Sequence, residues 1–454
     1  MFERLILTDL GKWAKREGRK PLVLRGARQV GKTTLINLFS KNFKQYLYLN
    51  LELVADKAPF ENFTNIDQLV QTLFFEKNKV YSKKDSTLIF IDEIQELPAA
   101  LQILRYFYEQ EPHIHVVAAG SLLETLFKTE VSFPVGRVEY LVVRPASFPE
   151  FLSAIGETTA LEQLHIIPFN DFAYDKLLSL FHTYAIIGGM PEIIKKYAET
   201  KDITALKKIY ESLLISYMDD VEKYATSQAQ VQHIRHAMQS GFAVAGRRIK
   251  FEGFGKSNYG SREMGEALRT LEKALLLHLV YPETNQVLPS LPDKKKSPRL
   301  QLLDTGLMNY STGIQKEIIG TNNLDTVYEG VLIEHLVGQE LLVLEDSNIH
   351  GLHFWVREKK TSQAEVDYLY RYNSKLIPVE VKSGATGTLR SLHLYMDLAP
   401  HNMAIRFCAA KKNITKITTH SGKEYYLLTL PYFLVTKIEE YLVWFEEEIK
   451  KMRL

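Results

Sequence analysis

The chain has 454 residues, which is too long for one hydrophobic core and predicts two or three domains. Its composition, 46% hydrophobic and 24% charged residues, is ordinary for a globular protein. The net charge of +2 does not by itself call for nucleic acid as a partner, so local charged patches must be judged separately. The single cysteine, Cys408, excludes internal disulfides and zinc sites built from several cysteines. No apolar run approaches the length of a membrane span, and the first residues lack a signal-peptide core, so we expect a cytoplasmic protein without a membrane partner.

A glycine-rich motif lies near the start of the chain and consists of Gly26, Ala27, Arg28, Gln29, Val30, Gly31, Lys32 and Thr33, followed by Thr34. It matches the pattern G-x-x-x-x-G-K-[ST] of a phosphate-binding loop, and an apolar strand at 21–24 and a helical stretch at 34–39 flank it as that pattern requires. The glycines let successive backbone N–H groups point at phosphate oxygens, and the helix N-terminus adds partial positive charge. We expect Lys32 to reach the β- and γ-phosphates of ATP and the Thr33 hydroxyl to hold Mg²⁺.

A second landmark follows a strand at 46–52 and a helix at 66–76. The apolar run 88–91 predicts a buried parallel strand, and it ends in two acids, Asp92 and Glu93. Ligands bind at this end of the strands in open α/β sheets. We therefore expect Asp92 to lie near Mg²⁺, through a water molecule, and Glu93 to orient or deprotonate the attacking water. The alternative is two solvated acids after a core strand.

The rest of the first 152 residues completes an α/β pattern with a helix at 98–109 and a strand at 115–121. That strand is expected between the phosphate-loop strand and the strand at 88–91. Ser121 at its end either senses the γ-phosphate or only ends the strand in a turn. Arg137 and Arg144 are candidates for an arginine finger, although an ordinary surface arginine is the more common case.

Helical periodicity predominates from 148 to about 228, interrupted by a turn at 188–192. The acids within 217–222 are expected on a solvated helix face. Residues from about 229 to 304 predict a small helical domain with a β-wing, in which the helix 261–277 is amphipathic. Its cations Arg262, Arg269 and Lys273 fit nucleic acid in a winged helix, whereas its acids Glu263, Glu266 and Glu272 favour a protein or interdomain contact.

The C-terminal part becomes α/β again, with Glu334 on an apolar helix and strands at 365–370 and 377–382. Side chains alternate along a strand, so Glu380 and Lys382 point the same way, and Asp367 on the preceding strand is expected to join them. These carboxylates, with Glu334 as a third acid, would hold a second Mg²⁺ or Mn²⁺, and Lys382 would position water beside a phosphodiester. The alternative is a solvent-exposed sheet face of mixed charge.

The order of these motifs resembles that of a prokaryotic family of AAA-type ATPases that carry a restriction-endonuclease-like domain in their C-terminal region. The segments that carry the resemblance are 26–34, 91–95, 119–121, 136–137, 147–151, 303–307 and 379–384. The resemblance implies ATP binding and hydrolysis at Lys32, Thr33, Asp92 and Glu93, a winged-helix segment, and a nuclease-like fold around Asp367, Glu380 and Lys382. Many AAA-type proteins have asparagine where this chain has Ser121.

We therefore predict an α/β protein with four parts: a P-loop AAA-type core with a parallel sheet at 1–152, a helical lid or linker at 153–228, a winged-helix-like domain at 229–325, and a restriction-endonuclease-like domain at 326–454. The predicted function is Mg²⁺-dependent ATP hydrolysis that controls a nuclease-like, DNA-acting domain. One alternative is an ATP-driven switch that binds a protein partner through an inactive nuclease-like scaffold. Another is a P-loop kinase, and oligomer formation is left open.

Overall fold

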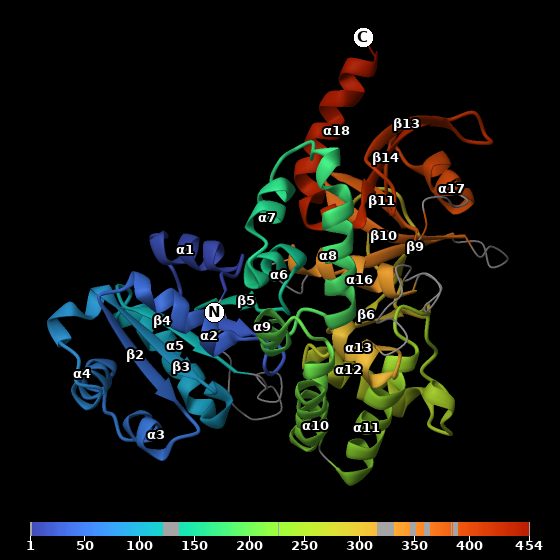
Figure 1. The fold of residues 1–454 in the computed structure, drawn as a ribbon. Helices are drawn as coiled ribbons and strands as arrows, with labels where there is room; N and C mark the ends of the chain where they lie inside the picture. The colour runs from blue at the N-terminus through green and yellow to red at the C-terminus, as the bar shows by residue number, and fades with distance from the viewer. Residues whose placement is uncertain are drawn as a thin grey trace.

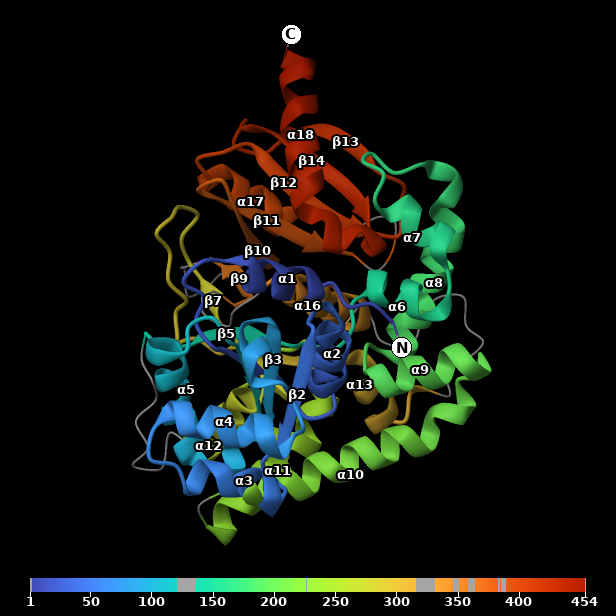
Figure 2. The same cartoon turned by 90° about the vertical axis from the view of Figure 1, so that its left-hand side faces the viewer.

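The computed structural model describes residues 2–120, 136–225, 227–315, 331–345, 351–357, 364–382, 384 and 389–453. Figure 1 shows the N-terminal region in blue at one side, helices in green and yellow beside it, and the C-terminal region in orange and red. A quarter-turn away, Figure 2 shows the C-terminal sheet above the N-terminal region. Among the described residues, none of the helices has both the length and the apolar character needed to cross a membrane.

The N-terminal region contains a five-stranded sheet in the order β2-β3-β4-β1-β5, and every pair of neighbouring strands is parallel. The strands are β1 (Leu22–Arg25), β2 (Gln45–Asn50), β3 (Thr87–Asp92), β4 (His115–Ala119) and β5 (Glu139–Val142). The helices are α1 (Leu7–Lys15), α2 (Lys32–Phe39), α3 (Val54–Glu61), α4 (Ile66–Glu76) and α5 (Pro98–Gln110). The predicted parallel sheet is confirmed, and β4 lies between β1 and β3 as expected.

Burial on both faces explains the continuous apolar run of β3. Leu88 and Phe90 pack into the larger hydrophobic cluster, with the side chains of α2, whereas Ile89 and Ile91 pack on the other face with those of α4 and α5. A strand covered on both faces has no polar position until its end, which is where Asp92 lies. Asp92 therefore lies at the same edge of the sheet as the glycine-rich loop after β1.

A helical region follows and consists of α6 (Phe148–Ile155), α7 (Thr158–Leu164), α8 (Tyr174–Ile187), α9 (Pro191–Thr200) and α10 (Lys207–Tyr224). The middle region contains α11 (Gln228–Ala243), α12 (Ser261–Lys273), β6 (Leu277–Val280), β7 (Pro282–Glu283), β8 (Arg299–Leu302) and α13 (Thr305–Ser311). Strands β6 and β8 pair antiparallel, and Arg248 forms a further antiparallel bridge with Arg299. The segment between β6 and β8 extends to the C-terminal sheet, because β7 pairs with β9 there.

The C-terminal region is built on a seven-stranded mixed sheet in the order β13-β14-β12-β11-β10-β9-β7. Its elements are α16 (Val331–Val343), β9 (His353–Val356), β10 (Glu365–Tyr372), β11 (Lys375–Val381), α17 (Arg390–Leu398), β12 (Met403–Cys408), β13 (Asn413–Thr418), β14 (Glu424–Pro431) and α18 (Ile438–Arg453). Strands β9, β10 and β11 pair antiparallel, and β12 joins β11 in parallel after α17.

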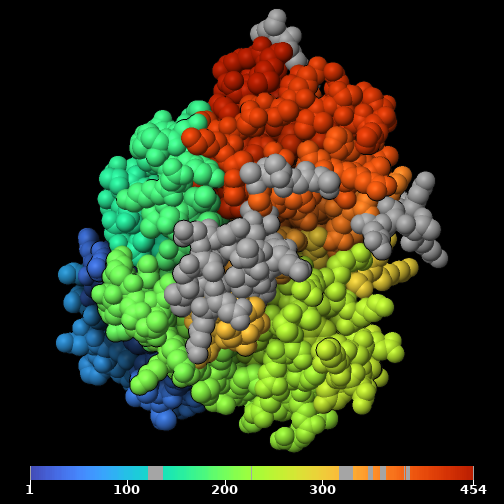
Figure 3. Space-filling view, turned by 45° about the vertical axis from the view of Figure 1, so that its right-hand side comes forward, coloured from blue at the N-terminus to red at the C-terminus, as the bar shows by residue number. Residues whose placement is uncertain are grey.

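The regions share one large hydrophobic cluster, which extends from Leu10 in α1 through Tyr184 in α8 to Phe445 in α18. The Tyr184 hydroxyl donates to Glu340 Oε1 at 2.6 Å, and the Phe148 N–H donates to Glu340 Oε2 at 3.0 Å. In the space-filling view of Figure 3, the green helical region and the orange to red C-terminal region lie directly against each other. The phosphate-loop sheet is thus packed into one body with the helices and the C-terminal region.

Candidate functional site

The glycine-rich loop lies between β1 and α2, at the carboxyl end of the parallel strands. Gly31 precedes α2 with φ of 94°, a left-handed conformation that glycine adopts without strain. At Gly26 the need for glycine is steric, because a Cβ atom there would lie 2.5 Å from the Val143 carbonyl oxygen. Both glycines of the predicted motif are therefore required by the local geometry.

Lys32 is the first residue of α2, and its buried side chain folds back over the loop. Its Nζ donates to the carbonyl oxygens of Gly26 and Ala27 at 3.0 and 2.9 Å. Burial lowers the pKa of Lys32 to about 8, while the charges of Glu93 and Asp92 act in the opposite direction. An anion beside this ammonium group would restore its ordinary pKa, because opposite charge favours the charged form. Thr34, the third residue of α2, is exposed.

Thr33 and the end of β3 meet directly. Thr33 Oγ1 donates to Asp92 Oδ2 at 2.6 Å, and the Glu93 N–H donates to Asp92 Oδ1 at 3.1 Å. Asp92 is buried, and burial is the main cause that raises its pKa, although the hydrogen bond from Thr33 opposes this. A hydroxyl and a carboxylate side by side at the loop fit the oxygen ligands that Mg²⁺ uses with nucleotide phosphates.

Glu93 begins the turn after β3 and has φ of 51°, which is uncommon for a residue with a side chain. Gln95 Nε2 donates to Glu93 Oε2 at 2.6 Å and so fixes the direction of the carboxylate. The structure therefore brings Lys32, Thr33, Asp92 and Glu93 to one edge of the sheet.

Two elements of the helical region contact the loop from outside. Arg28 Nη1 donates to Asp220 Oδ1 of α10 at 2.7 Å, and the Tyr217 hydroxyl donates to the Arg28 carbonyl oxygen at 2.8 Å. Asp220 is 3% exposed, so the expectation of a solvated face for this part of α10 is wrong for Asp220. Pro191 at the start of α9 also reaches the loop, with its Cγ 3.4 Å from the position of a Cβ built on Gly31.

Arg4, before α1, is a further contact of the loop that the sequence did not single out. Arg4 Nη1 donates to the Val30 carbonyl oxygen at 3.2 Å, Nη2 donates to the Arg144 carbonyl oxygen at 2.7 Å, and Nε pairs with Glu150 at 3.0 Å. Arg4 and Glu150 are both buried. This pair joins the start of the chain, the loop and the start of α6.

The two arginine-finger candidates lie elsewhere. β5 runs parallel to β1 with Glu139 beside Leu22, so Arg137 lies at the amino end of the strands, opposite the loop. There it pairs with Glu109 at 2.9 Å. Arg144 is at the carboxyl end but turns toward His278 Nε2, 3.2 Å away, and burial lowers the pKa of Arg144 to about 10. Ser121 lies outside the described residues, and its sensor role stays a prediction.

A second group of charges lies where the middle and C-terminal regions meet. Arg299 of β8 pairs with Glu334 of α16 and with Glu365 and Asp367 of β10. Its guanidinium lies over the Phe354 ring, 4.7 Å from the centroid. Burial lowers the pKa of Arg299, but the three carboxylates outweigh burial and raise it overall. A buried arginine thus stands among the acids for which the sequence predicted a metal ion.

The expected neighbours of Glu380 are present. Glu380 pairs with Lys382 at 2.5 Å on the same face of β11, and Asp367 Oδ2 accepts from the Val381 N–H at 2.8 Å. Burial raises the pKa of Glu380 to about 8, and the charge of Asp367 adds to this. Within the described part of the chain, however, no three His, Cys, Asp or Glu side chains are arranged to hold a metal ion. The carboxylates predicted for a second Mg²⁺ or Mn²⁺ are instead paired with cations, because Arg299 contacts Glu334 and Asp367 while Lys382 contacts Glu380.

Helix α12 carries most of its predicted charges on its exposed side, whereas Glu272 is half-buried. Arg262 pairs with Glu266 at 3.5 Å, and Glu272 Oε1 accepts from the Leu279 N–H at 2.8 Å. Arg269 and Lys273 are exposed. The mixture of acids and cations expected for this helix is therefore present on its surface, and it does not form a purely basic face.

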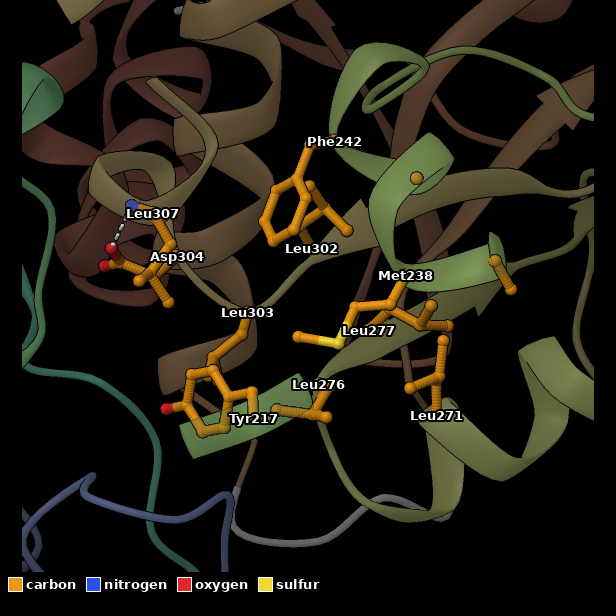
Figure 4. Close-up of a pocket in the computed structure, with 12 residues that line it drawn as sticks. Tyr217, Met238, Phe242, Leu271, Leu276, Leu277, Leu302, Leu303, Asp304 and Leu307 are labelled. Carbon is orange, nitrogen blue, oxygen red and sulfur yellow. Dashed lines mark hydrogen bonds between the residues drawn. The ribbon is translucent and has the colours of Figure 1, made fainter. Parts of the chain in front are cut away.

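An apolar cavity lies between α10, α11, α12 and β8, and Figure 4 shows Tyr217 and Asp304 among its lining residues. Its volume of about 20 Å³ is enough for a water molecule and too small for a nucleotide. Asp304 accepts from the Leu307 N–H at 3.0 Å, drawn as a dashed line, and from the Gly189 N–H at 2.5 Å. Burial raises the pKa of Asp304 to about 6, and its hydrogen bonds with backbone N–H groups oppose this. Asp304 therefore joins the turn before Pro191 to α13.

Comparisons with known proteins agree with this geometry. Residues 18–152 match an AAA domain family. This match falls on the region that carries the parallel sheet and the glycine-rich loop. Residues 178–318 and 329–426 match two domains of unknown function, DUF8612 and DUF4143. No curated protein matches the chain.

Several solved structures of low sequence identity are similar to parts of this chain. The Walker-type ATPase paby2304 of Pyrococcus abyssi is 13% identical, with a TM-score of 0.44 over 69% of this chain and 96% of that chain. The ORC1 protein of Aeropyrum pernix, solved in complex with DNA, is 15% identical, with a TM-score of 0.27 over 68% of this chain and 90% of that chain. A signal transduction ATPase with numerous domains, PH0952 of Pyrococcus horikoshii, is 12% identical, with a TM-score of 0.28 over 75% of this chain and 46% of that chain.

Proposed function

We propose that this protein is a Mg²⁺-dependent ATPase that converts ATP and water to ADP and phosphate. The observation that carries the proposal is the convergence of Lys32, Thr33, Asp92 and Glu93 at the carboxyl edge of the sheet, with Thr33 and Asp92 in direct contact. The match of residues 18–152 to an AAA domain supports it independently.

Each group of the candidate site has a separate role in the proposed reaction. Loop N–H groups and the N-terminus of α2 bind the phosphates, and Lys32 exchanges its two carbonyl partners for phosphate oxygens. Thr33 and Asp92 would hold Mg²⁺, which would supply positive charge to neutralise the phosphates. Glu93, whose carboxylate is fixed by Gln95, orients the attacking water and accepts its proton.

The two acids after β3 favour water as the acceptor over another substrate, which distinguishes an ATPase from a P-loop kinase. The test is product analysis with purified full-length protein, ATP and Mg²⁺. Release of free phosphate, lost in Lys32→Ala, supports the proposal. Transfer of phosphate to an added small molecule, or no difference between wild type and Lys32→Ala, contradicts it.

We also propose that the nucleotide bound at the loop biases the arrangement of the helical and C-terminal regions. The loop touches α10 through Arg28 and Tyr217, and it touches α9 through Pro191. Asp304 connects the turn before α9 to α13, and Glu340 connects α8 to α16. These contacts form a continuous path from the phosphate loop to the C-terminal region.

Two functions are considered for the C-terminal region: an active nuclease, and a switch built on a catalytically silent scaffold. One observation favours the switch. The order α16, three antiparallel strands, α17 and a parallel β12 supports the proposal of a restriction-endonuclease-like fold. The pairing of Glu380 with Lys382 and the hydrogen bond from the Val381 N–H to Asp367 support it as well. Arg299 among the acids favours a switch with a catalytically silent scaffold, because it stands where a metal ion would have to bind.

The middle region supports a winged-helix proposal by the order of its elements. Residue 248, β8 and β6 form a small antiparallel sheet beside α11 and α12. The segment that would form the wing includes β7, which is paired with β9. This favours an interdomain or protein-binding role for the segment over a free DNA-binding wing.

Plasmid cleavage with Mg²⁺ or Mn²⁺ separates the two functions of the C-terminal region. The switch proposal expects no cleavage by wild type with or without ATP. Cleavage that Lys382→Ala abolishes would instead establish a nuclease. Tight, salt-sensitive DNA binding by the full chain would add DNA as a partner.

A further inference from the structure

Arg28, the third residue of the phosphate loop, has a side chain without a role in the ATPase site described above. Its backbone belongs to the loop, while its guanidinium pairs with Asp220 on α10 at 2.7 Å. The side chain of Arg28 is 38% exposed, whereas that of Asp220 is 4% exposed. The arginine is therefore the more solvent-exposed half of the pair.

Arg28 belongs to the same loop as Lys32, and its charge interacts with those of the groups proposed to react. The hydrogen bond with Asp220 is the main cause that raises the pKa of Arg28, and the charges of Glu93 and Glu52 add to it. The charge of Arg28 in turn contributes to the lowered pKa of Lys32, after burial. Lys32, Glu93 and Arg28 are thus electrostatic neighbours around one loop.

We propose that Arg28 is a catalytic residue that stabilises the charge of the γ-phosphate of ATP, and that Asp220 holds it in a resting position from which ATP withdraws it. This inference rests on the proposed ATPase function. The other candidates do not supply this charge in the same subunit, because Arg137 lies at the far edge of the sheet and Arg144 turns toward His278.

Arg28 can exchange Asp220 for the phosphate oxygens of ATP without leaving the buried carboxylate far from a cation. A guanidinium binds phosphate oxygens through two N–H groups at once, which is stronger than a partly exposed ion pair. When Arg28 leaves, the buried Asp220 keeps a cation nearby, because Lys223 Nζ lies 3.5 Å from its Oδ1. The Tyr217 hydroxyl holds the backbone carbonyl of Arg28, so α10 stays attached to the loop while the side chain moves.

The exchange also gives α10 a way to distinguish ATP from ADP. With ADP the γ-phosphate is missing, so Arg28 stays with Asp220. With ATP, Arg28 leaves Asp220, so the charge on the side of α10 that faces the loop changes. The helix stays attached to the loop through Tyr217. Asp220 is in this sense a positioning residue, since it acts on the nucleotide through Arg28.

The experiment measures two quantities on full-length protein: the affinities for ADP and for a non-hydrolysable ATP analogue, and steady-state phosphate release. We expect Arg28→Ala to lower kcat by about 1,000-fold or more, because an arginine that stabilises a transferring phosphate contributes about 10³–10⁵-fold to kcat. It should weaken binding of the analogue by about 10-fold and leave ADP binding within about twofold. Arg28→Lys should lie between Arg28→Ala and wild type.

Asp220→Asn should change the affinity for the ATP analogue in the opposite direction to Arg28→Ala. Removing the competing charge should strengthen binding of the analogue by about threefold or more without changing ADP binding. In the Arg28→Ala background, Asp220→Asn should have no effect on analogue binding, because it acts through the arginine. Asp219→Asn, one residue earlier and exposed on the same helix, is the matched control and should behave as wild type.

Three results overturn the inference. They are unchanged kcat in Arg28→Ala, equal changes in ADP and analogue affinity, or shifts of the same sign in Arg28→Ala and Asp220→Asn, any of which would make the pair a structural anchor only. A wild-type chain that binds no ATP overturns the proposed function itself. Active wild type with equally active Arg28→Ala overturns only the role of Arg28.

Discussion

Thr33 Oγ1 donates a 2.6 Å hydrogen bond to Asp92 Oδ2, which joins the start of α2 to the end of β3. The two oxygens belong to residues 59 positions apart in the sequence and come from neighbouring parts of one sheet edge. Their contact is what turns two separate motifs into one candidate metal and phosphate site.

The first prediction concerns this contact. Thr33→Val keeps the shape of the side chain but removes the oxygen, so Mg²⁺ should no longer strengthen ATP binding. We expect the ratio of ATP affinities with Mg²⁺ and with EDTA to fall by about 10-fold, since one lost ligand to a charged group costs about 1.5–3 kcal/mol. Titration of ATP in both buffers measures it. Thr72→Val on α4, where the hydroxyl is exposed, is the control, and an unchanged ratio in Thr33→Val would remove Thr33 from the site.

The second prediction concerns the steric need for Gly26. Gly26→Ala places a Cβ 2.5 Å from the Val143 carbonyl oxygen and should destabilise the fold by about 1–3 kcal/mol, with loss of ATP binding. Gly11→Ala is the contrast, because nothing lies within 4 Å of its Cβ and it stands inside α1. It should raise stability by about 0.5–1 kcal/mol. Denaturant unfolding measures both, and equal effects would contradict the loop geometry.

The third prediction tests Arg299 as the cation of the acidic group. Arg299→Ala leaves Glu334, Glu365 and Asp367 without their shared partner and should cost about 3–5 kcal/mol of unfolding free energy. The exposed Arg262→Ala should change it by less than about 0.5 kcal/mol.

A metal titration adds a sharper readout to the same variant. The freed carboxylates of Arg299→Ala should take up Mn²⁺, so the ion should raise the Tm of the variant more than that of wild type. A larger effect of Mn²⁺ on wild type would show that Arg299 does not stand in for a metal ion.

The fourth prediction is a pH dependence that originates at Glu340. Burial raises the pKa of Glu340 to about 8, although hydrogen bonds from Tyr184 and the Phe148 N–H oppose this. The folded state therefore keeps a proton that the unfolded chain loses near its ordinary pKa, and stability falls as pH rises from about 4.5 to about 8. The slope approaches about 1.4 kcal/mol per pH unit.

Glu340→Gln removes the titrating group and keeps the shape of the side chain. Relative to wild type, the variant should therefore gain stability steadily from pH 5 to pH 8. Unfolding of both proteins at several pH values measures the difference. A difference that is constant with pH would contradict the raised pKa.

The convergence of Lys32, Thr33, Asp92 and Glu93 at one edge of the sheet could be predicted from the sequence because the motifs are local. The glycine spacing fixes the loop around Gly31, and the apolar run before Asp92 identifies a strand covered on both faces. The place of β4 between β1 and β3 followed from the same class of sheet. The four-part division of the chain stays a prediction.

The missed residues depend on packing between distant segments. Asp220 has the sequence environment of a solvated helix face, and only the docking of α10 against a loop 192 positions away buries it. Arg299 sits in a short strand, and its role appears only once β8 lies beside α16 and β10. The only signal in the sequence was a charged residue, Arg299, in an otherwise buried strand, and it did not identify the carboxylates that pair with it.

The measurement that tests the central claim most directly is phosphate release by Glu93→Gln alongside ATP binding by the same protein. The amide keeps the size and hydrogen-bonding position of the side chain but cannot accept the proton of the attacking water. ATP affinity should stay within about twofold of wild type, whereas turnover should fall by about 100-fold or more. Phosphate release at the wild-type rate in Glu93→Gln would contradict the account of this edge of the sheet as an ATP-hydrolysing site.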